Sequence, residues 1–418
     1  MNACDAPFPM KAIPEPCFPE HTVSCGDYPS IQAAVDACAA LGGGTVLIPE
    51  GAWQSGPIHL HSRIRLHLAD NACVTFDPEP ERYLPPVLTR WEGIECYNYS
   101  PLIYARDCEQ IAITGRGTLF GNGQAWWDWK QRQQAAADAL YRQAVEQTPV
   151  DQRVYGTREA ALRPSFVQLI NCRRVLLEDF RIVDGPQWTL HPVYCEDVIV
   201  RRVHVSTHGH NTDGLNPDSC RNVLIEDSDF STGDDCIALN AGMNEDGWRV
   251  GRPCENVVIR NCAMTGGHGA VVIGSAVSGG VRNVLVTSCR IRDTMQGLRI
   301  KSMRGRGGYV ENVCFQDIDI LHVSNEAIQI NMFYEFTTVM PATQIPSVFR
   351  HIAFRHIRGR GADTGILMRG LPEQRLEDIA FEDVDLTAEK AMLCSDGVGV
   401  TFDQVRIRPP MDGCGCQP

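Results

Sequence analysis

The sequence predicts an all-β fold, a single-stranded parallel β-helix or solenoid, with a capping helix near its N-terminus. The first observation is a repeated pattern of alternating apolar residues, a polar corner and a second short strand. The second is that the repeats follow one another at short intervals, with one helical insertion among them. Short strands that repeat in this way are typical of solenoids, in which each coil packs on its neighbours.

The repeats are visible in "CRRVLLEDFRIVDG" from residue 172, "CEDVIVRRVHVSTHG" from 195 and "CRNVLIEDSDFSTGD" from 220. The step from Val175 to Val198 is 23 residues, the shortest, and the step from Val313 to Ile352 is 39, the longest. A solenoid is quasi-one-dimensional, so we expect residues 1–418 to form a single domain in spite of their number. The equivalent apolar residues of successive coils are Val175, Val198, Val223, Val257, Val284, Val313, Ile352 and Ile379.

Both ends of the chain and one insertion depart from the repeat. Residues 1–50 form the N-terminal cap region, where "SIQAAVDACAAL" reads as an amphipathic helix with Ser30 as its N-cap. Residues 124–148 read as a helical insertion, which we expect to form a flap or wall at the surface. Residues 409–418 are expected to be an irregular tail.

The composition limits the classes of partner. A formal net charge of −13 argues against a general nucleic-acid binder, which needs a broad basic surface, but allows an anionic small substrate in a local cationic pocket. No apolar run is long enough to span a bilayer, so no membrane partner is expected. Because no signal peptide precedes the chain, we expect a cytoplasmic location; the alternative is a secreted or periplasmic protein with its signal removed. The oligomeric state is left open.

Cysteine is frequent, with 18 residues spread along the chain, and we expect mostly reduced thiols. Five of them lie three residues before the equivalent apolar positions of their coils, and they should stack in a buried column. A structural column is favoured over a metal or redox role. The five are Cys108, Cys172, Cys195, Cys220 and Cys254.

Two adjacent carboxylates interrupt the coil "STGDDCIALN" at Asp234 and Asp235. Such a pair costs Coulomb energy, because each carboxylate disfavours ionisation of the other. Aligning the coils places Asp213 of the preceding coil and His268 of the following coil beside them. An acidic turn and a turn histidine would each be ordinary alone, but their stacking on one edge predicts a functional site.

The next coil adds two cations, Arg299 and Lys301, whose separation of two residues puts both on one face of a strand. Three carboxylates suit hydrolysis of a glycosidic bond, in which one donates a proton to the leaving oxygen and another activates water. The guanidinium fork of Arg299 and the point charge of Lys301 suit a sugar that carries a carboxylate. The residues alone therefore predict a hydrolase of acidic saccharides.

Four motifs in this order, "NTDG", "GDDC", "GGHG" and "RIK", resemble the signature of the polygalacturonase family, glycoside hydrolase family 28. "GTLFGNGQAWW" and "GPQWTLH" extend the resemblance over nearly the whole chain. It implies a right-handed β-helix that cleaves α-1,4-galacturonosyl linkages of polygalacturonate or oligogalacturonides by an inverting mechanism, with neither metal nor cofactor.

The resemblance also implies roles for individual residues. Asp234 would be the general acid, while Asp213 and Asp235 would hold and deprotonate the attacking water. His268 would support the acid or the substrate. Arg299 and Lys301 would bind the galacturonate carboxylate, Asn211 would orient the site, and Tyr334 is the candidate for a tyrosine that belongs to it.

Two segments depart from compact endo-acting members of that family. "AGMNEDGWRVGRPC" between the second and third motifs, and "SMRGRGG" after the fourth, resemble exo-acting bacterial members. With residues 124–148 they would close one end of the cleft, so exo action is expected. Arg252, Arg304 and Arg306 of these segments are expected to be surface or loop residues rather than pocket residues.

Three alternatives remain open on the sequence. A rhamnogalacturonan-type hydrolase of the same family would share the fold and differ in the neighbouring sugar. A Ca²⁺-dependent pectate lyase would use the aspartates as metal ligands. A non-catalytic carbohydrate-binding β-helix would not need the adjacent aspartates.

Overall fold

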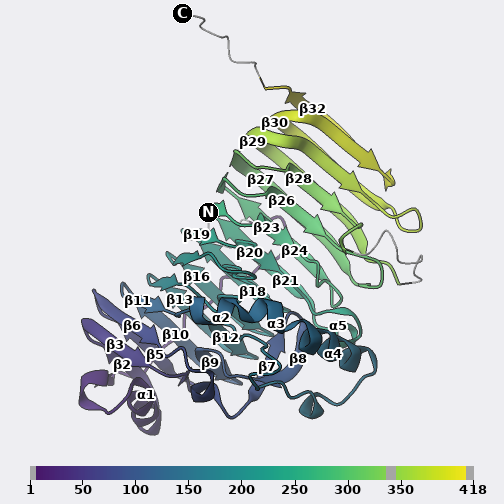
Figure 1. Cartoon of the computed structure of the whole chain (residues 1–418). Coiled ribbons are helices and arrows are strands. Elements are labelled where there is room, and N and C mark those ends of the chain that lie inside the picture. Colours follow the sequence, from purple (N-terminus) through teal and green to yellow (C-terminus); the bar gives the residue numbers. More distant parts are fainter. Residues whose placement is uncertain (1–5, 336–344, 411–418) are drawn as a thin grey trace, which may run out of the picture.

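The computed structural model describes residues 6–335 and 345–410. Its strands stack in parallel, coil upon coil, from the N-terminal end to the C-terminal end of one elongated solenoid (Figure 1). The predicted all-β parallel β-helix is therefore confirmed. Most of the predicted tail, residues 411–418, lies outside the described residues. Among the described helices, none is long and apolar enough to cross a membrane.

Three stacks of parallel strands form the coils. The first stack contains β1 (Thr22–Ser24), β2 (Gly44–Ile48), β5 (Ile64–Leu68), β10 (Glu109–Gly115), β13 (Arg173–Glu178), β16 (Glu196–Arg201), β18 (Arg221–Glu226), β21 (Cys254–Arg260) and β24 (Val281–Thr287). The second contains β3 (Gly51–Ser55), β6 (Ala72–Phe76), β11 (Thr118–Phe120), β14 (Arg181–Val183), β17 (His204–Thr207), β19 (Asp229–Thr232), β22 (Ala263–Gly266) and β25 (Arg290–Arg292).

The third stack carries the site described below. It contains β4 (Ile58–His59), β9 (Ile103–Arg106), β12 (Val167–Ile170), β15 (Leu190–Val193), β20 (Ile237–Leu239), β23 (Gly269–Ile273), β26 (Gln296–Lys301) and β28 (Glu326–Asn331). Bridges from Leu215 and Asp218 join β15 to β20. In the last coils the strands run on through the corners, as β27 (Tyr309–Leu321), β29 (Val348–Arg369), β30 (Leu376–Ser395), β31 (Gly397–Val398) and β32 (Thr401–Arg408).

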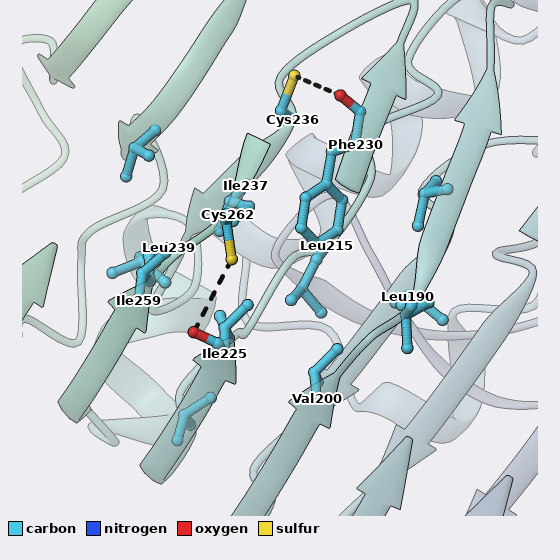
Figure 2. Close-up of a cluster of buried hydrophobic side chains, with 14 of the residues drawn as sticks. Leu190, Val200, Leu215, Ile225, Phe230, Cys236, Ile237, Leu239, Ile259 and Cys262 are labelled. Atoms are coloured by element: carbon cyan, nitrogen blue, oxygen red, sulfur yellow. Dashed lines mark hydrogen bonds between the residues drawn. The ribbon is translucent and has the colours of Figure 1, made fainter. Parts of the chain in front are cut away.

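The apolar residues aligned from the sequence are neighbours in the sheet: Val175 pairs with Val198, Val198 with Val223, and Val223 with Val257. Their side chains are buried and fill the interior together with residues of the other two stacks. Figure 2 shows this filling, with Val200 and Ile225 of the first stack near Phe230 and Leu215. Each stack contributes such a row of apolar side chains to the interior, and their burial stabilises the packing of coil on coil.

An asparagine ladder runs through the starts of four strands, in β18, β21, β24 and β27. Asn222, Asn256, Asn283 and Asn312 all have φ between 54° and 57°. Each side chain from Asn256 onward donates to the amide oxygen of the preceding asparagine, over 2.9 to 3.3 Å. Asparagine adopts this left-handed conformation at lower cost than most residues, and its amide satisfies both neighbours in the ladder.

The helix predicted in the cap region is α1 (Ile31–Ala40), and Oγ of Ser30 accepts a hydrogen bond from the Ala33 N–H over 3.1 Å, as expected of its N-cap. The predicted insertion at 124–148 forms three helices, α2 (Gln124–Trp127), α3 (Trp129–Arg132) and α4 (Gln134–Val145). Trp126 and Trp129 bury the first two against Tyr83 and Tyr99. Short 3-10 turns lie at Cys25–Asp27, Pro80–Tyr83 and Val150–Gln152.

Two elements outside the repeat lie beside this insertion (Figure 1). An antiparallel hairpin is formed by β7 (Val87–Trp91) and β8 (Ile94–Asn98). The segment "AGMNEDGWRVGRPC" contains α5 (Asn244–Val250), which contacts α4 and β8. These elements stand next to the third stack.

The N-terminal arm, residues 6–20, covers an apolar column on the outer face of the first stack. Met10 packs in one cluster with Leu224, Val258 and Leu285, and Phe18 in a second, farther toward the N-terminal coils. This arm explains why the central positions of these strands are apolar on both faces, which simple alternation does not predict. The five cysteines of the predicted column are buried and are free thiols.

Candidate functional site

A cavity of about 660 Å³ lies over the third stack. It is lined on the side of the coils by six of the residues predicted from the sequence: Asn211, Asp213, Asp234, Asp235, Lys301 and Tyr334. His268 stands beside the cavity, bonded to Asp234. Arg299 does not line the cavity, although it lies on the same strand as Lys301, β26.

The three carboxylates converge, since one oxygen of each lies within 4.8 Å of the others. Asp213 and Asp235 are buried, and Asp234 is partly exposed. Asn216 donates to Oδ2 of Asp213 over 2.8 Å, and Lys301 Nζ donates to Oδ2 of Asp235 over 2.9 Å. Within the described part of the chain, Oδ1 of Asp235 is buried without a hydrogen-bond partner.

His268 Nδ1 lies 3.0 Å from Oδ1 of Asp234. The turn that holds them so close depends on Gly267, whose φ is 72° and where a Cβ would lie 2.0 Å from the Asp234 carbonyl oxygen. Glycine is therefore required between the histidine and the preceding strand.

The environment separates the pKa values of the carboxylates. Burial, followed by the charges of Asp234 and Asp235, raises the pKa of Asp213 well above its ordinary value. Burial also acts to raise the pKa of Asp234, but the His268 hydrogen bond, with the charges of His268 and Lys301, outweighs it and leaves that pKa lowered. The hydrogen bond to Asp234 raises the pKa of His268 against the opposing effect of burial. Of Asp213 and Asp234, Asp213 is therefore the weaker acid, and the contact between His268 and Asp234 favours an ionised carboxylate beside a charged imidazole.

The two predicted cations, Lys301 and Arg299, have different surroundings. Lys301 is buried and ion-paired, and its Nζ lies 5.1 Å from the centre of the Tyr334 ring. Arg299 donates to Gln329 Oε1 over 2.8 Å, and its guanidinium lies 5.6 Å from the same ring. The Tyr334 ring therefore lies near both cations. Lys301 and Tyr334 line the cavity, whereas Arg299 lies outside the lining.

Asn211 connects the carboxylates to a layer beneath them. Its amide nitrogen lies 3.4 Å from Oδ2 of Asp234, and its amide oxygen accepts from Arg163 over 2.8 Å. Arg163 is fully buried, and it also donates to the Gln133 side chain at 3.1 Å. Burial lowers the pKa of Arg163 to about 10, so its guanidinium remains charged at neutral pH. The insertion is linked in this way to the cluster of carboxylates.

The sequence pattern of the family Glycosyl hydrolases family 28 matches residues 38–401. The chain belongs to this family. A hyperthermoactive exopolygalacturonase from Thermotoga maritima is 37% identical, with a TM-score of 0.91 over 95% of this chain and 94% of that chain. The resemblance drawn from the four motifs is confirmed, and so is the right-handed parallel β-helix that it implied.

Curated relatives are more distant. A probable polygalacturonase of Vitis vinifera is 29% identical over 280 residues, 65% of this chain and 52% of the relative. The exo-poly-alpha-D-galacturonosidase of Dickeya chrysanthemi is 25% identical over 337 residues, 73% of this chain and 54% of the relative. The chain spans about half the length of these curated relatives.

In this member of family 28, three segments outside the repeat line the cavity opposite the coils. They are α4, the segment at α5 and the loop that carries Arg306. Asn244 at the start of α5 donates to the Tyr141 hydroxyl of α4 over 2.8 Å and accepts from Arg306 over 2.9 Å. Arg153 and Asp246 form a buried ion pair of 2.7 Å behind them. These contacts fasten the segments to one another beside the cavity, and closure of the cleft by them stays a prediction.

Arg306 corrects a prediction, because it is buried and lines the cavity instead of lying at the surface. The sequence could not show that Asn244 and Ser275 would meet its guanidinium from other loops. Arg252 is exposed and stacks on Tyr194, and Arg304 pairs with Glu373, so these two lie outside the cavity lining as expected.

The cavity has further lining residues that sequence reasoning did not select. Trp91 and Glu92 come from the tip of the hairpin, Trp188 from the motif "GPQWTLH", and Tyr141 from α4. Trp188 and Tyr141 lay in segments that carried a signal, the motif "GPQWTLH" and the helical insertion, whereas the hairpin carried none. The hairpin and α4 belong to no repeat, so no alignment of coils places them beside the aspartates.

Among the described residues, these three aspartates form the group whose carboxylate oxygens lie close enough together to hold a metal ion. Their oxygens suit a hard cation such as Ca²⁺. Lys301 already neutralises Asp235 at 2.9 Å and occupies one of its oxygens, which lowers the number of ligands the set can offer. The absence of a metal in the reaction stays a prediction.

Proposed function

We propose that the chain hydrolyses α-1,4-galacturonosyl linkages of polygalacturonate or its oligomers, one unit at a time from a chain end. The single observation that carries this proposal is the cavity: three converging carboxylates lie on one side of it and a wall of inserted segments on the other. The polygalacturonases among its relatives, and an exopolygalacturonase at 37% identity, support the substrate and the mode.

The attacking water is held by Asp213 and Asp235. Lys301 and Asn216 each occupy one oxygen of these carboxylates, and Oδ1 of Asp235 accepts the water's hydrogen. Asp213 must be ionised to accept a proton, and its raised pKa makes it a better base than an ordinary carboxylate once it is ionised.

The leaving oxygen takes its proton from the Asp234–His268 pair. In the unliganded protein this proton resides mainly on His268, because the pKa of Asp234 is lowered and that of His268 raised. As sugar displaces water around Asp234, the lower dielectric favours the neutral acid, and the proton moves across the 3.0 Å hydrogen bond to Asp234. Asp234 then acts as the general acid.

Inversion rests on the resemblance to the family and needs its own measurement. Carboxyl groups of inverting glycosidases are usually about 6.5–9.5 Å apart, whereas one oxygen of each carboxylate here lies within 4.8 Å of the others. The spacing alone therefore does not predict inversion, and the anomer released first decides the stereochemical outcome.

Proton NMR of trigalacturonate hydrolysis in excess EDTA tests the proposal. Initial release of β-galacturonate from the α-linked substrate, undiminished by EDTA, is expected; the α-anomer would overturn inversion. An unsaturated product or loss of activity in EDTA would indicate a lyase. With polygalacturonate, monomer should accumulate while viscosity falls slowly, and a rapid fall would overturn the chain-end mode. Asp234→Asn should lower kcat by about 10²- to 10⁴-fold without unfolding the protein.

We propose a cytoplasmic location for this activity, as expected from the sequence. The buried column of free thiols supports it, because a reducing compartment keeps such neighbours unpaired. Fractionation of the native cells would test the location, and recovery of the enzyme outside the cytoplasm would favour the secreted alternative.

A further inference from the structure

Two residues at the tip of the β7–β8 hairpin, Trp91 and Glu92, line the cavity. Trp91 pairs with Ile94 across a two-residue loop formed by Glu92 and Gly93. Such loops favour Asn-Gly or Asp-Gly, because both central residues have positive φ. Here φ is 44° at Glu92 and 88° at Gly93. Glutamate is not among the residues that this turn favours, and here its side chain lines the cavity.

The carboxylate of Glu92 is held in place from a different coil. Gln187, which is only 2% exposed, donates from Nε2 to Oε1 of Glu92 over 2.8 Å. The hairpin itself is fixed by the bond from the Met243 N–H to the Gly93 carbonyl, at 3.1 Å. Glu92 is therefore a preorganised acceptor and not a solvated surface charge.

Trp91, which precedes Glu92 in the chain, carries a donor with no partner in the described part of the chain. Its side chain is 8% exposed, and within the described residues its indole N–H is buried without a hydrogen-bond partner. An unpaired buried N–H costs about 1–3 kcal/mol, which is recovered when a ligand oxygen accepts from it. Trp188 lines the same cavity and adds a second aromatic surface, suited to packing against a sugar ring.

A sugar hydroxyl both accepts and donates, and so it matches a site that offers an N–H and a carboxylate. A galacturonate carboxylate only accepts hydrogen bonds and so does not match this donor and acceptor as a hydroxyl does. Burial raises the pKa of Glu92. Arg299 lies outside the cavity lining, and we expect units on the leaving side of the scissile bond there. The walled side then takes the terminal unit, whose 4-hydroxyl is the group that every internal unit has lost to a glycosidic bond.

We propose that Trp91 and Glu92 recognise the free 4-hydroxyl of the non-reducing terminal galacturonate. This inference rests on the proposed function and extends it: the enzyme selects chain ends by a hydrogen-bonded hydroxyl as well as by the wall. A site built to bond a hydroxyl rejects analogues that lack it by about 10⁴- to 10⁵-fold at the upper limit. Oligomers with a 4,5-unsaturated terminal ring, the products of pectin-cleaving lyases, should therefore be poor substrates.

The test compares kcat/KM for three substrates: trigalacturonate, trigalacturonate with a 4,5-unsaturated terminal ring, and trigalacturonate reduced with borohydride at its other end. The wild-type enzyme should cleave the first and third alike and the second at least 10²-fold more slowly. Equal cleavage of the saturated and unsaturated trimers would overturn the inference. Cleavage of none of the three would instead refute the proposed function.

Two variants locate the discrimination. Trp91→Phe removes only the N–H, and should lower kcat/KM for the saturated trimer about tenfold while barely changing that for the unsaturated one. Glu92→Asn suits the turn while withdrawing the carboxylate, and should reduce the saturated-to-unsaturated ratio to below 10. Unchanged ratios in both variants, with melting temperatures near that of wild type, would overturn the assignment.

Asp138→Asn is the matched control for charge. Asp138 is an exposed carboxylate of α4 that also lines the cavity and accepts from Gln134 over 2.8 Å, so its replacement removes one negative charge from the same cavity and leaves Trp91 and Glu92 in place. It should change both substrates by the same factor and leave their ratio as in wild type. A ratio that falls as far in this control as in Glu92→Asn would mean that charge, and not hydroxyl recognition, sets the preference.

Discussion

His268 and Asp234 show how a single contact sets a protonation state. The hydrogen bond of 3.0 Å raises the pKa of the imidazole, with the charges of Asp234 and Asp235 acting in the same direction. The pKa of His268 is higher in the folded protein than its ordinary value of about 6.5. The folded protein therefore keeps the imidazolium above that pH and loses it as the pH rises through the raised pKa.

We predict that Asp234→Asn lowers the pKa of His268 toward about 6.5, because the main cause of its elevation is removed. A pH titration of the His268 Cε1 proton by NMR, assigned with His268→Gln, measures this shift. In the wild-type enzyme kcat should decline as the same group titrates at high pH. An unchanged His268 pKa in Asp234→Asn would contradict the role of this hydrogen bond.

Lys301 and Asp235 illustrate the cost of breaking a buried pair. Lys301→Met leaves the Asp235 carboxylate buried without its cation, and the free energy of unfolding should fall by about 3–5 kcal/mol. Lys390→Met is the control, because Lys390 pairs with Asp363 at the surface with 72% of its side chain exposed. Its effect should stay below about 1 kcal/mol. Urea unfolding followed by tryptophan fluorescence measures both, and equal losses would contradict the prediction.

At the scale of elements, the inserted segments and the arm depend on tertiary contacts. Residues 124–148 were expected as one helical stretch, but they break at Asp128 and Gln133, where Trp126 and Trp129 turn into a cluster with Tyr83 and Tyr99. Asp128 and Gln133 keep right-handed helical backbone angles, so the segment stays helical with two local irregularities.

The N-terminal arm gives a prediction at this scale. Phe8→Ser with Met10→Ser should uncover the outer apolar column of Leu224, Val258 and Leu285, lower the melting temperature and increase binding of a hydrophobic dye. Because the arm covers the first stack and the cavity lies over the third, kcat at low temperature should remain within about twofold of wild type. A large loss of kcat in a protein that stays folded would contradict this separation.

At the scale of the whole molecule, each coil contacts its neighbouring coils. A destabilising substitution at one end should therefore lower stability mainly in the coils near that end. The last coils are joined by a stack of Phe315, Phe354, Phe381 and Phe402, with ring centres 5.0 to 5.2 Å apart. Phe402 ends this stack and is 44% exposed.

Phe402→Ser should accelerate amide hydrogen exchange in β32 and β30 while leaving β10, β13 and β16 as protected as in wild type. Exchange measured by mass spectrometry on peptides from both ends checks this expectation. Uniform acceleration along the chain would show that the solenoid unfolds as one cooperative unit instead.

The sequence by itself determined the solenoid, the alignment of its coils and the convergence of Asp213, Asp234, Asp235 and His268. Each of these follows from a local pattern repeated at a regular interval, and parallel pairing turns equal position in the repeat into proximity. Only the tertiary structure decided that Glu92, Arg163 and Arg306 join the site. Their partners lie far away in sequence: Gln187 is 95 residues from Glu92, and Arg306 is 62 residues from Asn244. Contacts between insertions depend on how irregular loops pack over the coils, and no periodicity encodes that packing.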